Sequence, residues 1–273
     1  MNEKISLAGD LGSGKSTVSN ILIKELDAEY YSTGAIVRSI AAKRGMSVVE
    51  LNVYMETHPE IDTEIDEGVK ALADVEKSLI IDSRMAWHFT KGTFKVYLST
   101  DPETSALRIM NANRKGEHAA TLEETILETK ARRESEKKRY MTQYGVNIMD
   151  MTNYDLIVDT TAATPDEVAT YIIGAFNEWK NDRNYRISYI SSERLNFPDD
   201  APDEAKIAEY SSMLDCGEVI GQVEIAERDG EFYVVGSPER AIAYVMNAEG
   251  LIPCKLVADM PENAKYVKMR NSL

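Results

Sequence analysis

The stretch Gly9-Asp10-Leu11-Gly12-Ser13-Gly14-Lys15-Ser16 matches the phosphate-binding pattern G-x-x-x-x-G-K-[ST] and decides the fold of the first part of the chain. An apolar run at residues 4–8 predicts a short buried strand before it, and residues 17–26 predict a helix after it. In that frame the glycines let backbone N–H groups turn toward an anion, and the positive end of the helix points at the same place. We therefore expect Lys15 to reach the outer phosphates of a nucleoside triphosphate and Ser16 to ligate Mg²⁺.

The composition fits one large domain or two smaller ones. The chain has 273 residues, and its hydrophobic content of 43% is enough for a sizeable core. No apolar run reaches the ~18 residues that a membrane-spanning helix needs. The first predicted strand starts almost at residue 1, so no signal peptide is expected, and Cys216 and Cys254 form neither a metal motif nor a disulfide framework. A reducing, cytoplasmic setting is the simplest interpretation.

The charge of the chain is acidic overall but locally basic. A net charge of −15 argues against general affinity for nucleic acid or for an anionic membrane. Residues 108–139 nevertheless carry nine Lys or Arg against six Glu. In a chain with a phosphate loop, we expect this basic segment to act on a small polyanion. The alternative is a solvated helix that is stabilised by ion pairs between its own side chains.

Predicted strands alternate with predicted helices along the first 180 residues. Strands are expected at residues 29–31, 78–81, 94–98 and 156–158. Helices are expected at residues 34–44, 48–56, 59–74 and 121–143, and from residues 101 and 164 onward. Strands separated by helices indicate a parallel sheet with helices on both faces. Ligands of such sheets bind at the carboxyl ends of the strands.

Two polar clusters follow predicted strands. Thr33 and Arg38 follow the second strand, where a hydroxyl at a helix start and an arginine further along suit a phosphate or a base edge. Asp82 and Arg84 follow the third strand, where a carboxylate suits water on Mg²⁺ and a guanidinium suits bidentate binding of a phosphate. The alternatives are an ordinary helix cap with a solvated arginine, and a structural ion pair.

A third cluster lies on the long charged helix. Arg132, Glu136 and Arg139 are spaced i, i+4, i+7 and therefore share one helix face. This spacing predicts a carboxylate between two guanidinium groups.

Together these segments resemble the archaeal-type cytidylate kinase family over about residues 1–180. The resemblance is carried, in order, by residues 9–17, Ser32-Thr33-Gly34 with Arg38, Gly45-Met46-Ser47, His58-Pro59-Glu60-Ile61-Asp62, Ile81-Asp82-Ser83-Arg84, Arg132–Tyr140, and residues 144–148 leading into residues 154–160. It implies a P-loop nucleoside monophosphate kinase fold. That fold is a three-layer α/β/α parallel sheet with a monophosphate-binding helical segment and a mobile helical lid.

The resemblance also implies roles for individual residues. The ATP phosphates would be held by Gly9, Gly12, Ser13, Gly14, Lys15, Ser16 and Thr17, with Arg108 and Arg114 near the ATP base and phosphates. Mg²⁺ would be organised by Ser16 and Asp82. The acceptor nucleotide would be bound by Thr33, Arg38 and Arg84, and by the lid motif R-x-x-x-[DE]-x-x-R at Arg132, Glu136 and Arg139. The groups expected to act in catalysis are Lys15, Arg84, Arg132 and Arg139.

The implied reaction transfers a phosphoryl group from ATP to a nucleoside monophosphate, CMP or dCMP. Such a reaction needs alignment and stabilisation of negative charge, and no nucleophilic side chain. A kinase of another small metabolite is one alternative, and a regulatory protein with a degenerate, nucleotide-sensing kinase domain is another. Nucleotides are the expected partners, in place of nucleic acid or a membrane. The sequence does not give the oligomeric state.

Two residues of the implied site leave alternatives open. Asp10 places a carboxylate in the phosphate loop, where the family more often has a small residue or proline. It would weaken ATP binding unless its side chain turns away or caps the helix. Glu136 could accept a hydrogen bond from an exocyclic amine, which would favour cytosine over uracil, or could serve in a salt bridge.

Residues 184–273 lie outside this resemblance and predict a small α+β domain. The order is a strand at 186–190, a loop that contains residues 197–200, a helix at 203–214, a hairpin of residues 219–226 and 232–235, a helix at 238–247 and a closing strand at 252–257. The segment Gly236–Ala241 and its surroundings resemble the small domain shared by ParB-like proteins and sulfiredoxin. That resemblance implies a second anion site at Arg240 and the amides near Ser237. Otherwise, Arg240 would make a surface ion pair.

Overall fold

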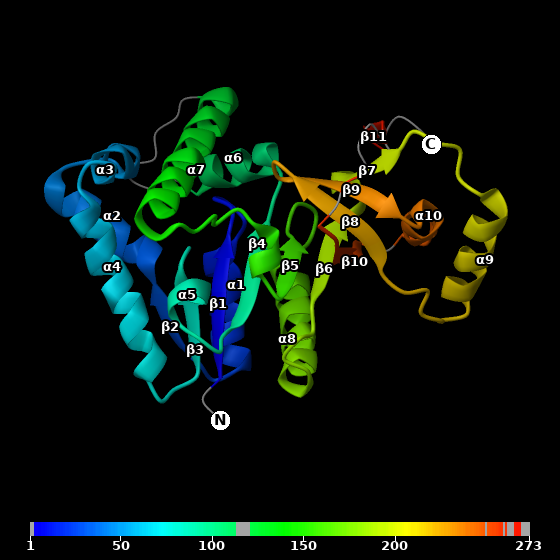
Figure 1. Cartoon of the computed structure of the whole chain (residues 1–273), viewed down its shortest axis with the longest axis horizontal. Coiled ribbons are helices and arrows are strands. Elements are labelled where there is room, and N and C mark those ends of the chain that lie inside the picture. The colour runs from blue at the N-terminus through cyan, green and yellow to red at the C-terminus, as the bar shows by residue number, and fades with distance from the viewer. Residues whose placement is uncertain (1–2, 113–120, 249, 259, 261–264, 269–273) are drawn as a thin grey trace. The chain divides into compact units, whose positions relative to one another are not determined.

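The computed structural model describes residues 3–112, 121–248, 250–258, 260 and 265–268 (Figure 1). These residues form two compact units, Met1–Tyr154 and Asp155–Leu273. The predicted division of the chain at residues 180–184 lies within the second unit. Among the described residues, no helix is long and apolar enough to cross a membrane.

The first unit is built on a parallel sheet. Its strands are β1 (Lys4–Gly9), β2 (Glu29–Ser32), β3 (Leu79–Asp82) and β4 (Phe94–Ser99), in the order β4-β1-β3-β2. Asp82 pairs in register with Leu7 on one side and with Ser32 on the other. The carboxyl ends of β1, β2 and β3 therefore meet at one edge of the sheet, where the phosphate loop begins.

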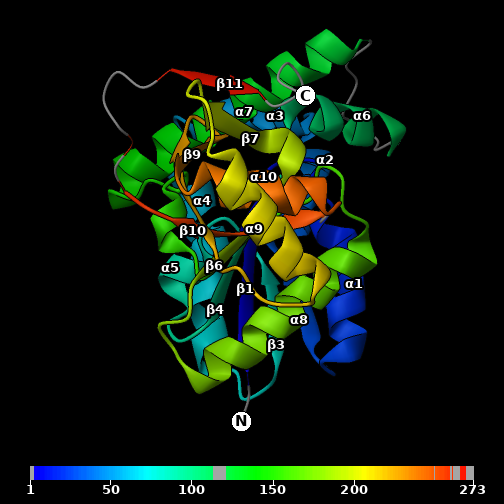
Figure 2. The ribbon, with the colours of Figure 1, turned by 90° about the vertical axis from the view of Figure 1, so that its right-hand side faces the viewer.

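Helices cover both faces of this sheet. Figure 2 shows its strands between α1 (Lys15–Glu25) and α5 (Ala86–Phe89). Because both faces are covered, the strands are continuous apolar runs, and Ile5, Leu7 and Ile81 are fully buried. The predicted three-layer α/β/α architecture is confirmed in this unit. The short helix α5 was not predicted.

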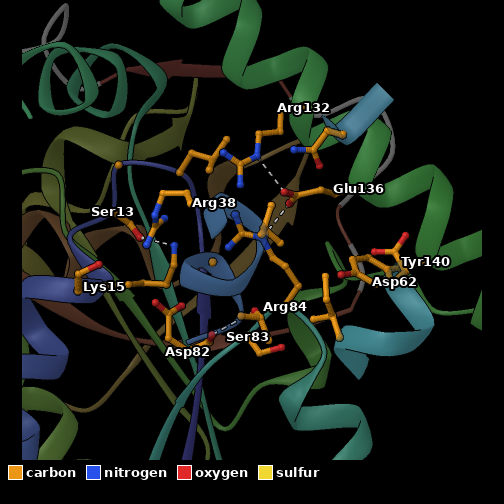
Figure 3. A pocket seen from close by; sticks show the side chains of 18 of the residues that line it. Ser13, Lys15, Arg38, Asp62, Asp82, Ser83, Arg84, Arg132, Glu136 and Tyr140 are labelled. Atoms are coloured by element: carbon orange, nitrogen blue, oxygen red, sulfur yellow. Dashed lines mark hydrogen bonds and ion pairs between the residues drawn. The ribbon is translucent and has the colours of Figure 1, made fainter. Parts of the chain in front are cut away.

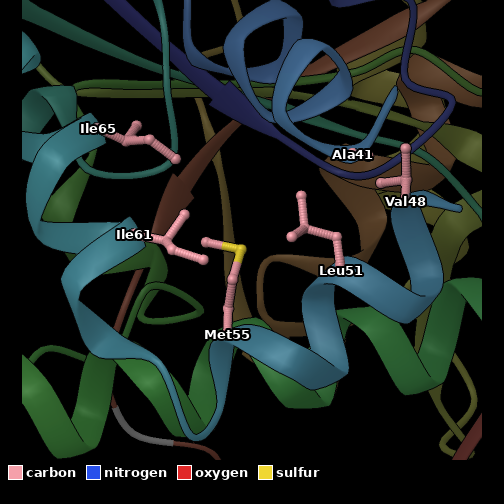
Figure 4. Packing of buried hydrophobic residues seen from close by; sticks show 6 residues of the cluster. All are labelled: Ala41, Val48, Leu51, Met55, Ile61 and Ile65. Atoms are coloured by element: carbon pink, nitrogen blue, oxygen red, sulfur yellow. The ribbon is translucent and has the colours of Figure 1, made fainter. Parts of the chain in front are cut away.

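Three helices form a subdomain beside the carboxyl edge. They are α2 (Thr33–Arg44), α3 (Val48–Met55) and α4 (Pro59–Ala71), and a 3-10 turn at Leu72–Asp74 follows them. Figure 4 shows their shared core, which consists of Ala41, Val48, Leu51, Met55, Ile61 and Ile65. Ser47 and Glu50 form a capping box that fixes the start of α3. This core holds α2 and α4 at a set spacing, so side chains on both helices can face one cavity.

In the described parts of the segment predicted as a lid, on either side of residues 113–120, the chain is helical. This segment contains α6 (Pro102–Asn111) and α7 (Leu122–Tyr144), and a 3-10 turn at Met151–Asn153 follows α7. Asp101 caps α6 through the N–H groups of residues 103 and 104, and a capping box at Thr121 begins α7. Helix α7 packs on α3 as well as on α6, so it reaches the monophosphate-side helices.

The second unit contains a mixed sheet. Its elements are β5 (Leu156–Asp159), α8 (Pro165–Asn181), β6 (Ile187–Ser191), a 3-10 turn (Ser192–Arg194), β7 (Leu195–Pro198), α9 (Glu204–Asp215), β8 (Val223–Arg228), β9 (Glu231–Gly236), α10 (Pro238–Met246), β10 (Leu251–Leu256) and β11 (Tyr266–Lys268). The strand order is β11-β7-β9-β8-β10-β6-β5. Strands β5 and β6 are parallel, whereas β6 and β10 are antiparallel. The predicted α+β character is confirmed.

Three details of the second unit differ from the sequence-based expectations. Residues 197–198, predicted as part of a loop, end strand β7, and β11 was not predicted. Strand β7 pairs with both β9 and β11, and this pairing buries Phe197. The strand expected from residue 219 begins at Val223 instead. Gly221 before it has a φ of 85°, which is a turn conformation and not that of a strand.

Arg240 lies within the second unit near the start of α10. Its Nη1 donates to the carbonyl of Gln222 at 2.6 Å, and its guanidinium carbon lies 5.4 Å from the centroid of the Tyr210 ring. These contacts, and not an ion pair with a described carboxylate, hold Arg240. Anion binding at this place stays a prediction.

Candidate functional site

The phosphate loop joins β1 to α1, and two of its glycines are required by close contacts. A Cβ atom on Gly9 would lie 2.4 Å from the carbonyl oxygen of Leu98. A Cβ atom on Gly12 would lie 2.5 Å from the carbonyl oxygen of Ser105, and the φ of Gly12 is 71°. Both positions therefore accept only glycine. Close contacts with strand β4 and helix α6 therefore fix the backbone of the loop.

Lys15 folds back over the loop. Its Nζ donates to the carbonyl oxygens of Gly9 at 2.9 Å and of Asp10 at 2.6 Å. Lys15 forms no ion pair with any carboxylate in the described ranges. Burial, and then the positive charge of Arg84, lower the pKa of Lys15 to about 7. Burial therefore disfavours the charged form of Lys15, and an anionic ligand beside it would favour that form.

Asp10 turns its carboxylate away from the interior of the loop. Its Oδ1 accepts a hydrogen bond from the hydroxyl of Tyr97 at 2.7 Å, and its Oδ2 accepts one from the N–H of Thr100 at 3.0 Å. Arg133 of α7 pairs with Oδ1 at 3.2 Å. This is one of the two arrangements in which a carboxylate at residue 10 is compatible with a bound triphosphate.

One cavity brings most of the predicted site residues together (Figure 3). The predicted residues that line it are Gly12, Ser13, Gly14, Lys15, Ser16, Thr17, Thr33, Arg38, Asp82, Arg84, Arg132, Glu136 and Arg139. They come from the loop, α1, α2, the end of β3 and α7. Basic groups that are far apart in the sequence thus converge at the carboxyl edge of the sheet.

Three predicted residues are not in that lining. Gly9 contributes its carbonyl, which accepts hydrogen bonds from Lys15 and Arg84. Arg108 lies on α6 and is not among the described residues that line the cavity. Arg114 lies outside the described residues.

Asp82 and Ser16 offer oxygen ligands near Lys15. Asp82 accepts through Oδ2 from the hydroxyl of Tyr30 at 2.9 Å, and its backbone carbonyl accepts from Thr33 at 3.3 Å. Burial, and then the charge of Asp82, raise the pKa of Tyr30, so this hydroxyl stays a donor. In the part of the chain that the structure describes, no group of three or more His, Cys, Asp or Glu could hold a metal ion. This donor set fits Mg²⁺, which keeps few protein ligands when it is bound with substrate phosphates.

Glu136 lies between two arginines, but one of them differs from the prediction. Its Oε1 accepts from Nε of Arg132 at 3.1 Å, and its Oε2 accepts from Nε of Arg84 at 2.8 Å. Burial opposes the charge of Glu136, but Arg84 and then Arg132 outweigh it and lower the pKa to about 2. Both oxygens are therefore engaged in ion pairs. Arg84 also donates to the carbonyl of Gly9, which links α7 to the phosphate loop.

Arg139, the other expected partner of Glu136, pairs with a different carboxylate. Its Nε donates to Oδ2 of Asp62 at 2.8 Å, and its Nη1 donates to Oδ1 of Asn52 at 3.1 Å. Asp62 and Asn52 also line the cavity, and neither was predicted as a site residue. A signal was present, because Asp62 and Asp66 fall on the buried face of α4 that also carries Ile61, Ile65 and Val69. Carboxylates on the buried face of a helix indicate buried partners.

Comparison with known proteins decides the family. The sequence of residues 4–162 matches the cytidylate kinase-like family. This chain belongs to that family. The resemblance drawn from the phosphate loop, the strand ends and the lid helix is therefore confirmed.

Two relatives show how much of this chain is similar in sequence to known cytidylate kinases. A cytidylate kinase of Archaeoglobus fulgidus is 36% identical over 173 residues, which are 63% of this chain and 93% of that protein. One of Sulfurisphaera tokodaii is 37% identical over 175 residues, which are 63% of this chain and 94% of that protein. Among solved structures, sulfiredoxin from Arabidopsis thaliana is 20% identical, with a TM-score of 0.25, and covers 27% of this chain and 85% of that one. A likeness at that level assigns no fold to residues 184–273.

Proposed function

We propose that this kinase transfers the γ-phosphoryl group of ATP to CMP or dCMP, which yields ADP and the corresponding diphosphate. The observation that carries the proposal is that Lys15, Arg38, Arg84 and Arg132 line the same cavity as Ser16 and Asp82. The family membership and the 36–37% identity to proteins named cytidylate kinase support the choice of acceptor.

The loop residues bind and orient the donor nucleotide. Backbone amides of the loop and of the start of α1 would bind the triphosphate, and Lys15 would exchange its two carbonyl contacts for phosphate oxygens. Mg²⁺, held with the phosphates by Ser16 and Asp82, would supply charge neutralisation. An anion beside Lys15 favours its protonated form, so ATP raises the pKa that burial has lowered.

The remaining basic groups hold the acceptor in line. Thr33 and Arg38 of α2 and Arg132 of α7 contact the acceptor, and Arg84 lies between the two nucleotides. In the transfer, the bond from the γ-phosphorus to its bridging oxygen breaks, and a new bond forms to an oxygen of the acceptor phosphate. The electron pair of the broken bond stays on ADP. Arg84 is preoriented for this step, because Glu136 and the carbonyl of Gly9 already fix its guanidinium.

A substrate screen tests the proposal against its two alternatives. Coupled ADP release is measured with CMP, dCMP, UMP, AMP and shikimate as acceptors, at fixed ATP and Mg²⁺. We expect acceptor-dependent release with CMP and dCMP. Release with another acceptor alone would indicate a different small-molecule kinase. ATP binding without any acceptor-dependent release would support the nucleotide sensor.

We further propose that the kinase domain extends to about residue 180, because the family match continues through β5 to residue 162. Residues 184–273 would then form an accessory domain. Expression of residues 1–182 and of residues 1–154 tests this boundary, and only the longer fragment should fold and turn over CMP. A cytoplasmic setting is part of the same proposal, because both cysteines, Cys216 and Cys254, are unpaired.

A further inference from the structure

The end of the cavity away from the phosphate loop carries a buried carboxylate beside a buried guanidinium. Figure 3 shows Asp62 and Tyr140 on the side of the cavity opposite Ser13 and Lys15. The side chains of Asp62 and Arg139 are only 3% and 7% exposed, and both residues line the cavity. Such a pair is costly to desolvate, so each group must be well partnered.

Each member of this pair has one atom left for a ligand. Asp62 uses Oδ2 to accept from Nε of Arg139, and no described residue donates to its Oδ1. Arg139 uses Nη1 for Asn52 and Ser135, and its Nη2 donates to no described acceptor. Neither Oδ1 nor Nη2 is an enclosed atom without a partner. Both atoms are therefore accessible to some degree, and both belong to residues that line the cavity.

A carboxylate oxygen only accepts hydrogen bonds, and a guanidinium only donates them. Oδ1 of Asp62 is an acceptor and Nη2 of Arg139 is a donor. Together they complement a planar ligand whose edge carries a donor next to an acceptor. Cytosine has such an edge, with an exocyclic amine at C4 next to the acceptor N3. Uracil has a carbonyl at C4, which would place an acceptor against the carboxylate. C4 lies opposite the sugar across the ring, so it is the substituent that reaches the far end when the phosphate is held near Lys15.

We propose that Asp62, positioned by Arg139, accepts a hydrogen bond from the exocyclic amine of the acceptor base and selects cytosine over uracil. The inference rests on the proposed phosphorylation of a pyrimidine nucleotide. Glu136 does not take this role, because its two oxygens are occupied by Arg132 and Arg84. Discrimination of this kind is strong, because the wrong base would leave a buried carboxylate without its partner.

The first experiment changes the substrate and leaves the protein intact. The kcat/KM of the full chain is measured for CMP, for UMP and for the monophosphate of 2-pyrimidinone riboside, which has hydrogen in place of the amine. We expect the last two to be slower by about 10- to 100-fold, the effect of one hydrogen bond to a charged group. Equal efficiency of CMP and the 2-pyrimidinone nucleotide would overturn the inference.

The second experiment changes the residue. Asp62→Asn should reduce the ratio of CMP to UMP efficiency at least tenfold, since an amide can donate to the uracil carbonyl. The matched control is Asp66→Asn, one turn further along α4. Asp66 does not line the cavity and accepts from the hydroxyl of Tyr144 at 2.9 Å. Burial raises its pKa to about 7, so its replacement by a neutral amide is mild, and the ratio should not change.

ATP affinity and circular dichroism show whether the variant has folded. A folded Asp62→Asn protein with the wild-type ratio would overturn the inference. If this variant does not fold, the 2-pyrimidinone comparison on the unchanged protein decides alone. Failure of the two proposals can be told apart. No nucleotide-dependent ADP release from the unchanged protein contradicts the proposed function, whereas equal turnover of CMP and UMP contradicts only the role of Asp62.

Discussion

The two ends of the cavity use positive charge in different ways. At the phosphate end, Lys15 and Arg38 form no ion pair with a described carboxylate. At the other end, Arg139 is bound to Asp62, and between the two ends Arg84 and Arg132 share Glu136. Lys15 therefore has no carboxylate partner until an anion binds, whereas each of the three arginines is already paired with a carboxylate of the protein.

This difference separates side chains that are available to bind a ligand from side chains whose ion pairs fix the geometry of the site. Lys15, a desolvated cation without a carboxylate partner, destabilises the ligand-free protein and is stabilised most when phosphate binds, whereas Arg38 is exposed. A buried pair contributes little net stability as a pair, but removal of one member leaves the other charge unpartnered. Substitutions at the two ends should therefore have opposite effects on stability.

The largest effect is expected from Lys15→Met. Loss of the group that faces the transferring phosphoryl should lower kcat/KM by about 10³-fold or more. The thermal midpoint of the ligand-free protein should rise, because a desolvated ammonium is removed. Steady-state kinetics and differential scanning calorimetry measure the two effects. Lys24→Met, an exposed position on the same helix, serves as the control and should change neither.

The stabilisation by Lys15→Met should depend on pH. The pKa of Lys15 is about 7 in the folded protein, against 10.5 as its ordinary value. Between those values the unfolded chain binds the extra proton, so wild-type stability rises with pH relative to the variant. The gap in thermal midpoint should be widest near pH 6 and narrow by pH 9. A gap that widens over this interval would contradict the buried, depressed state of Lys15.

Arg139→Met tests the far end through stability. It leaves the Asp62 carboxylate buried without its partner, so the free energy of unfolding should fall by about 3–5 kcal/mol. The control is Lys138→Met on the same helix. Lys138 pairs with Glu56 but is 71% exposed, and its loss should cost at most about 1 kcal/mol. Urea titration compares them, and equal losses would show that burial of the pair is not the cause.

Glu136→Gln tests how strongly the central carboxylate is paired. The pKa of Glu136 is lowered from 4.5 to about 2 in the folded protein. Its stabilisation is therefore complete above pH 4.5 and is lost as the pH falls toward 2, a change of roughly 3 kcal/mol. The difference in unfolding free energy between wild type and variant should shrink over that range. A constant difference between pH 6 and pH 3 would indicate that Glu136 is not held by Arg84 and Arg132.

The phosphate end could be predicted from the sequence because its signals are local. The residues from Gly9 to Ser16 carry both the loop conformation and the ligand contacts within eight positions. Asp82 and Arg84 follow an apolar strand, so their place at the carboxyl edge follows from parallel pairing. A prediction of this kind depends only on one strand or helix and on the residues that follow it.

The far end was only partly predictable because its contacts join distant helices. Arg139 and Glu136 share a face of α7, yet their partners Asp62 and Arg84 come from other elements. Helix spacing alone favours an ion pair between Glu136 and Arg139 within α7. Packing against the rest of the protein decides whether each of them pairs instead with a residue from another element. Strand β11 was missed for the same reason, since three residues become a strand only by pairing with β7.

The smallest effect is expected from Arg108→Ala. Arg108 was implied near the ATP base, but among the described residues it does not line the cavity. The KM for ATP should change less than about threefold, as for most surface substitutions. Arg38→Ala, which removes a cavity-lining cation, should raise the KM for CMP by about 10- to 100-fold in the same assay. If Arg108→Ala weakened ATP binding as strongly as Arg38→Ala weakens CMP binding, then the cation-rich end of the cavity would extend onto α6. Arg108 would then have to be grouped with Lys15 and Arg38, which bind a ligand, and not with the arginines that are paired within the protein.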